Sequence, residues 1–73
     1  MKLYVYKINY RSYVTISDSN SIGGNFSLTI NEAINEYFKN SWNMSQDGYW
    51  STFITKNKPV LVIDSEINPE YFI

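Results

Sequence analysis

Residues 29–42, which read TINEAINEYFKNSW, carry the clearest structural signal in the chain. Thr29 and Glu32 have the spacing of a capping box, in which the hydroxyl and the carboxylate each bind a free backbone amide at a helix start. Apolar or small side chains then recur at helical spacing, and polar side chains occupy the opposite side. The stretch therefore predicts a helix with one packing face, formed by Ile30, Ala33, Ile34, Tyr37, Phe38, Ser41 and Trp42.

Two alternating segments precede this helix. From Lys2 to Tyr10 both alternating sets of side chains are largely apolar, which is typical of a central strand. The alternation resumes over residues 13–17, so the two segments predict an antiparallel hairpin. Residues 17–25 have turn composition, and residues 25–28 predict a short third strand with Phe26 and Leu28 facing inward.

Two further segments follow the helix. Residues 49–55 alternate again and predict a fourth strand, and residues 60–63 form an apolar run typical of a strand covered on both faces. We therefore expect one α+β domain over residues 1–73, with an antiparallel sheet of four or five strands in ββ(β)αββ order. One helix packs on one face of that sheet. The predicted core contains Leu3, Val5, Val14, Ile16, Ile30, Ile34, Phe38, Trp42, Ile54, Leu61 and Ile63.

Composition argues against catalysis. The chain has neither His nor Cys, so the commonest general bases, nucleophiles and transition-metal ligands are missing. Glu32 and Glu36 lie four residues apart and offer a carboxylate pair, but a solvated helix face explains them better. We expect no enzymatic activity and no cofactor. Seven Tyr, four Phe and two Trp are more large rings than so small a core holds, which favours a binding surface.

Charge makes nucleic acid an unfavourable partner, because the net charge is only −1. Lys2, Lys7 and Arg11 make the first segment basic, and the last ten residues are acidic. Either the two ends are neighbours in one sheet, or the acidic end is a binding patch. A single-strand nucleic-acid platform formed by Tyr4, Tyr6, Tyr10 and Tyr13 is an alternative that stays open.

The expected contact surface is the polar side of the helix together with the acidic end of the chain. A homodimer through an edge strand or through residues 71–73 is a further possibility. The sequence has no apolar stretch long enough for a signal peptide or a spanning helix, so we expect a cytoplasmic protein. The residues expected at the protein-binding surface are Glu32, Glu36, Lys39, Asn40, Asp47, Asp64, Glu66, Glu70 and Tyr71.

Residues 18–22 (DSNSI) and 38–43 (FKNSWN), with residues 65–68 (SEIN), resemble segments of small phage-encoded anti-CRISPR proteins. The resemblance implies a phage or mobile-element protein that binds and blocks a type II RNA-guided DNA nuclease of the host. The best-understood inhibitor of that kind is strongly acidic and imitates DNA at the PAM-reading surface. This chain departs from it in net charge, so DNA mimicry would depend on a local cluster such as Asp47, Asp64, Glu66 and Glu70.

A second resemblance concerns the start of the helix, where Thr29, Glu32 and Ala33 match a Thr-x-x-Glu-Ala pattern. The pattern is similar to that of antitoxin domains that bind a small toxin ribonuclease. The Gly-Cys segment usual before that helix is missing here. The alternative function is therefore an antitoxin or immunity-type partner.

Overall fold

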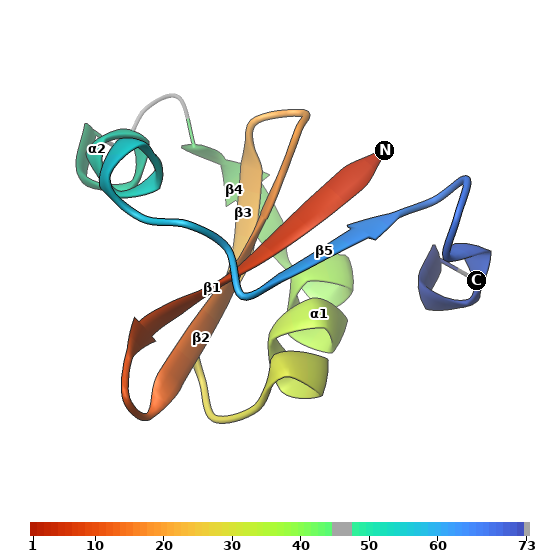
Figure 1. Ribbon diagram of the computed structural model, residues 1–73, viewed down its shortest axis with the longest axis horizontal. Helices are drawn as coiled ribbons and strands as arrows, with labels where there is room; N and C mark the ends of the chain where they lie inside the picture. Colours follow the sequence, from red (N-terminus) through yellow and green to blue (C-terminus); the bar gives the residue numbers. More distant parts are fainter. Residues whose placement is uncertain (45–47, 73) are drawn as a thin grey trace.

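The computed structural model describes residues 1–44 and 48–72, which form a five-stranded antiparallel sheet with a helix on each face (Figure 1). This confirms the predicted α+β class. Across the sheet the strand order is β4-β3-β2-β1-β5. The elements are β1 (Lys2–Asn9), β2 (Ser12–Ser17), β3 (Ser21–Ser27), α1 (Ile30–Lys39), β4 (Ser41–Asn43), α2 (Gly48–Lys56), β5 (Leu61–Asp64) and the 3-10 helix η2 (Pro69–Phe72).

β1 lies inside the sheet, as its two apolar faces predicted, and it pairs with β2 on one side and with β5 on the other. Lys2 lies opposite Asp64 in the β1–β5 register, and the amino group of Met1 donates to the Ser65 hydroxyl at 3.0 Å. The basic first strand and the start of the acidic end are therefore neighbours, which is the first of the two alternatives.

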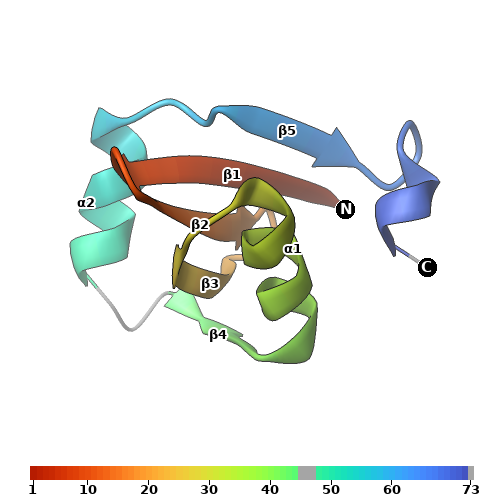
Figure 2. The same cartoon turned by 90° about the horizontal axis from the view of Figure 1, so that it is seen from below.

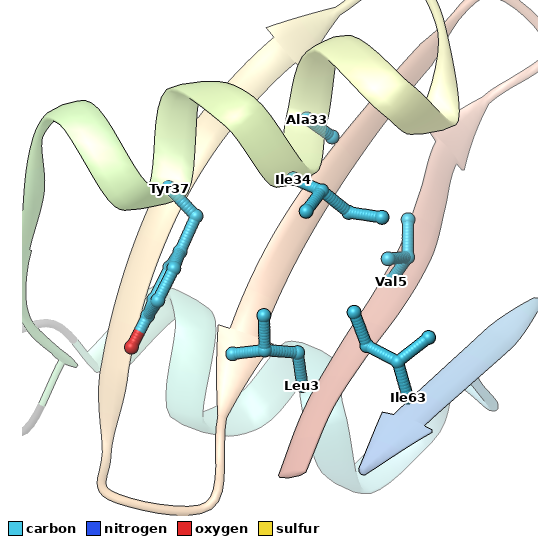
Figure 3. Close-up of a cluster of buried hydrophobic side chains, with 6 residues drawn as sticks. All are labelled: Leu3, Val5, Ala33, Ile34, Tyr37 and Ile63. Carbon is cyan, nitrogen blue, oxygen red and sulfur yellow. The ribbon is translucent and has the colours of Figure 1, made fainter. Parts of the chain in front are cut away.

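One face of the sheet packs against α1. The backbone amide of Glu32 donates to the Thr29 hydroxyl at 3.0 Å, which confirms the predicted cap. Figure 3 shows the helix in front of the sheet, with its buried side chains directed toward those of β1 and β5. The core cluster on this face consists of Leu3, Val5, Ala33, Ile34, Tyr37 and Ile63, with Ile30 and Leu61 packed against it.

The other face packs against α2, which corrects the prediction of a strand over residues 49–55 (Figure 2). The segment alternates, but Trp50, Phe53 and Ile54 also have the i, i+3, i+4 spacing of a helix face. Those three side chains pack against the second face of β1 and β2, and this burial decides between the two patterns. The second cluster consists of Tyr6, Val14, Ile16, Ile22, Met44 and Trp50, with Tyr4, Ile8, Phe53 and Ile54 at its margin.

The helix α1 ends at Lys39, earlier than its apolar stripe suggested. Trp42 lies on the short strand β4 and is 40% exposed, and Phe38 is also exposed, so both were wrongly predicted as core. The Phe38 ring instead meets the Phe72 ring edge-on, with centroids 5.6 Å apart. The apolar end of the chain thus folds back onto α1 as far as Phe72.

β5 is an edge strand, not the doubly covered strand that residues 60–63 predicted. Val60 and Val62 are exposed, whereas Ile63 is buried. At Asp64 the free edge is closed by the chain itself, because the backbone oxygen accepts from the amides of Ile67 and Asn68. A continuing strand from another chain is therefore hindered at this point.

The tyrosine platform, which was an alternative for Tyr4, Tyr6, Tyr10 and Tyr13, does not form in the structure. Tyr6 is buried, and Tyr4 and Tyr13 are half-buried, whereas Tyr10 at the β1–β2 turn is exposed. The four rings have different environments, so they offer no common stacking surface. Within the described part of the chain, no helix combines the length and apolarity needed to cross a membrane.

Candidate protein-binding groove

Two consecutive glycines in β3 bring α1 against the sheet backbone. A Cβ atom at Gly23 would lie 2.7 Å from the Tyr37 Cα, and one at Gly24 would lie 2.5 Å from the Ala33 oxygen. Any side chain here would push the helix away. The glycines, which had indicated a loop, therefore belong to a strand that starts at Ser21, four residues before the predicted start.

Beyond these glycines β3 bulges. Tyr13 pairs with Ser27 and Thr15 pairs with Gly23, so three residues of β3 lie opposite the single residue between them on β2. Gly24 and Phe26 both have positive φ, at 69° and 67°, and the Ser27 hydroxyl donates to the Gly24 oxygen at 2.6 Å. A bulky residue rarely adopts this conformation, which costs about 1–3 kcal/mol.

The bulge turns apolar side chains outward. Phe26 is 65% exposed and Leu28 is exposed as well, so the prediction that both face inward is wrong. The alternation of a regular strand would have buried one set of side chains, but the inserted residues break it. A strained backbone here holds an aromatic ring in solvent.

Two polar side chains of α1 and one from the residue that caps its C-terminal end border the same region. Glu32, Glu36 and Asn40 are spaced four residues apart and form one stripe along the helix. Glu32 accepts from the Leu28 amide at 3.2 Å, which fixes the chain that enters the helix. Glu36 has a long contact of 3.7 Å with the well-exposed Lys39. An exposed pair of this kind contributes little, so the Glu36 carboxylate is easily redirected.

These elements enclose an open groove of about 290 Å³ between the bulge of β3, α1 and β4. β4 pairs only with residues 21–23 of β3, so the bulged part of β3 has β2 on one side and no paired strand on the β4 side. Trp42 stands at the end of this gap. The groove is lined by Gly24, Asn25, Phe26, Ser27, Glu32, Glu36, Asn40 and Trp42.

The groove combines two carboxylates, amide groups and two aromatic rings. Such a set suits a cationic side chain, because a carboxylate attracts the charge and a ring face accepts it. Among the described residues, no three Asp, Glu, His or Cys side chains gather in a way that could hold a metal ion. The groove is therefore chemically suited to a cationic group.

The structure divides the expected contact surface in two. Glu32, Glu36 and Asn40 line the groove, and Lys39 lies beside it. Asp64, Glu66, Glu70 and Tyr71 belong to β5, the following turn and η2, on the opposite edge of the sheet from β4. Asp47 lies outside the described residues.

Sequence reasoning missed Phe26 and Trp42 as groove residues, because apolar side chains at alternating or helical spacing predict burial. For Phe26 the signal that could have found it is the Gly23–Gly24 pair, which ends two residues before it. Glycine within a strand often marks a bulge or a close backbone approach, and both occur here.

No protein-family model, curated protein or solved structure gives a significant match to this chain.

Proposed function

We propose that this protein is a non-catalytic binding domain that inhibits a host protein by docking the α1–β3–β4 groove onto a basic surface. The proposed partner is a type II RNA-guided DNA nuclease of the host bacterium. The observation that carries the proposal is the groove itself, in which exposed rings and carboxylates converge beside a strained bulge.

The aromatic side chains supply the binding energy in this account. Phe26 and Trp42 expose large rings at the two borders of one groove, and Trp is enriched among the residues that dominate protein interfaces. Strain at Phe26 has no role in packing the core, because its side chain points to solvent. Strained residues of this kind cluster at ligand-binding sites.

The negative charges of the groove determine the specificity for a basic partner in this account. Glu32 and Glu36 lie four residues apart on α1, where like charges repel by about 0.2–0.5 kcal/mol. A basic partner surface relieves that repulsion. RNA-guided nucleases hold their nucleic acids in a positively charged channel, and the resemblance of residues 18–22 and 38–43 to anti-CRISPR proteins points to the same class.

The test is cleavage of a target DNA by a guide-loaded type II nuclease in the presence of the protein. We expect inhibition by the wild type and a loss of about ten-fold or more in potency for Glu36→Lys, which places a cation in the groove. The matched control is Glu70→Lys, which makes the same charge change on η2 and should inhibit as the wild type does. Equal inhibition by both variants would contradict binding of the nuclease by the groove.

Binding is measured in parallel, by retention of the nuclease on the tagged protein with and without DNase and RNase. Retention that is independent of nucleic acid supports direct docking. If the nuclease is not retained under either condition, the proposed partner is wrong.

Phe26 allows stability and binding to be separated. Phe26→Gly removes the ring and also the strain of a positive φ, so the free energy of unfolding should rise by about 1 kcal/mol. Inhibition should weaken at the same time. Thermal unfolding and the cleavage assay measure the two effects, and a variant that is less stable but fully inhibitory would contradict the assignment.

A further inference from the structure

A second surface lies at the opposite edge of the sheet and is independent of the groove. Residues 56–66 read KNKPVLVIDSE and pass from the end of α2 through β5 into the following turn. Their charges are separated along the segment, with Lys56 and Lys58 at one end and Asp64 and Glu66 at the other. The two exposed valines, Val60 and Val62, lie between the charged ends.

The valines belong to a face that the chain itself leaves uncovered. Val62 lies opposite Tyr4 in the β1–β5 register, and Tyr4 borders the cluster beneath α2. Val62 therefore points to the α2 side of the sheet, yet it is 47% exposed because α2 covers the inner strands. The apolar run 60–63 has the composition of a doubly covered strand, but the structure covers only the side of Leu61 and Ile63.

We propose that a second copy of this chain covers this face, with the two segments antiparallel and the two-fold axis near Val62. A two-fold axis requires a self-complementary surface. With the axis at Val62, each Lys58 approaches Glu66 of the other copy, the two Val62 side chains meet at the centre, and Val60 lies opposite Asp64. The two-fold axis thereby forms two symmetry-related Lys58–Glu66 pairs, one on each side of the central valines.

The contact is made through side chains, not through a continuous ten-stranded sheet. The Asp64 oxygen on this edge already accepts from the Ile67 and Asn68 amides. Strand pairing with a second chain is therefore hindered at the C-terminal end of β5. The interface is formed by one short strand and the residues beside it, so it is small and places the dimer in the weak and transient class.

The test is the molar mass of the purified protein by analytical ultracentrifugation from about 10 µM to about 1 mM. The wild-type mass should rise toward that of two chains over this range. Val62→Lys should weaken the dimer about ten-fold or more, because it puts two cations at the axis. Since Val62 is half exposed, the variant should keep its fold, which circular dichroism checks.

Charge reversal tests the antiparallel arrangement. Lys58→Glu and Glu66→Lys should each weaken the dimer about five-fold. In a two-fold dimer each substitution breaks both symmetry-related Lys58–Glu66 pairs. The double variant Lys58→Glu/Glu66→Lys should restore it. A monomer at every concentration, a dimer indifferent to Val62→Lys, or a double variant no better than the single ones would overturn the proposal. The result does not depend on any nuclease, so the two proposals can fail separately.

Discussion

The two helices cover opposite faces of one sheet in different ways (Figure 2). α1 has a side-chain cap and lies against the backbone of β3 through Gly23 and Gly24. α2 begins at Gly48 and is held by the rings of Trp50 and Phe53 and by Ile54. Local signals and close backbone packing therefore define α1, whereas side-chain burial from a distant part of the chain defines α2.

The difference has a functional counterpart. The close approach of α1 to β3 is accompanied by a bulge, and the bulge and the helix together border the groove. α2 covers its face of the sheet with the rings of Trp50 and Phe53. In the proposed function the α1 side contacts the partner, whereas α2 completes the second core cluster.

The two tryptophans give the largest expected contrast in stability. Trp50 on α2 is 6% exposed and meets the Phe53 ring at 5.3 Å, so Trp50→Ala should cost about 3–5 kcal/mol. That loss approaches the whole stability of a domain this small. Trp42→Ala, at the groove, should cost about 1 kcal/mol or less. Chemical denaturation measures both, and a loss of only about 1 kcal/mol for Trp50→Ala would mean that α2 is not essential to the core.

Two glycines provide the next contrast. Gly24→Ala adds a Cβ that collides with the Ala33 backbone at a positive φ, so we expect a loss of about 3 kcal/mol. Gly48 has open space around it, and Gly48→Ala should change stability by about 0.5 kcal/mol at most. Thermal unfolding of the two variants checks the close packing of α1. A tolerated Gly24→Ala would show that the helix can move away.

Two threonines test the capping of α1. Thr29→Ala removes the hydroxyl that accepts the Glu32 amide and should cost about 1 kcal/mol. Thr52 is an exposed residue within α2, where alanine is the better helix former, so Thr52→Ala should gain a few tenths of a kcal/mol, about 0.3. Helix content by circular dichroism and the midpoint of urea unfolding report these opposite signs. A stabilising Thr29→Ala would contradict the role of the cap.

The smallest expected effect is a loss of stability at alkaline pH, caused by Tyr6 on the α2 side of the sheet. Burial, and then the neighbouring Tyr4, raise the pKa of Tyr6 above its ordinary value. Below about pH 10 the Tyr6 phenol is neutral in both the folded and the unfolded chain, so its full contribution to stability is present at those pH values. Above that pH the unfolded chain ionises first, and stability falls until the folded pKa is passed.

Tyr6→Phe should reduce this alkaline loss, because phenylalanine does not ionise and keeps the ring contact with Phe53 at 5.5 Å. Tyr10→Phe, at an exposed ring, is the control. Urea unfolding at pH 8 and at about pH 11 gives the difference. A parallel loss in the wild type and in Tyr6→Phe would contradict the assignment.

The sequence was informative wherever local chemistry and long-range packing agree. The Thr29–Glu32 cap and the alternation of β1 and β2 predicted the right elements, because the local backbone preference and the burial of apolar side chains favour the same structure there. Residues 48–56 were misassigned because aromatic and β-branched side chains fit both a strand and a helix face. Only the burial of Trp50 beside Tyr6 and Val14 decides between them, and that depends on contacts distant in sequence.

The candidate site was predictable in part, for a similar reason. The stripe of Glu32, Glu36 and Asn40 follows from helical spacing alone. The position of Phe26 depends on a bulge, and that of Trp42 depends on a helix that ends at Lys39. Neither feature has a strong local signal. The acidic end of the chain lies at the opposite edge because β5 pairs with β1.

The most direct test of the account is hydrogen exchange of the backbone amides with and without the guide-loaded nuclease. We expect slower exchange over residues 24–28 and 32–42, which border the groove, and no change over α2. Protection of α2 with no change at the groove, or no protection anywhere at saturating nuclease, would contradict the claim that the α1 side is the binding surface.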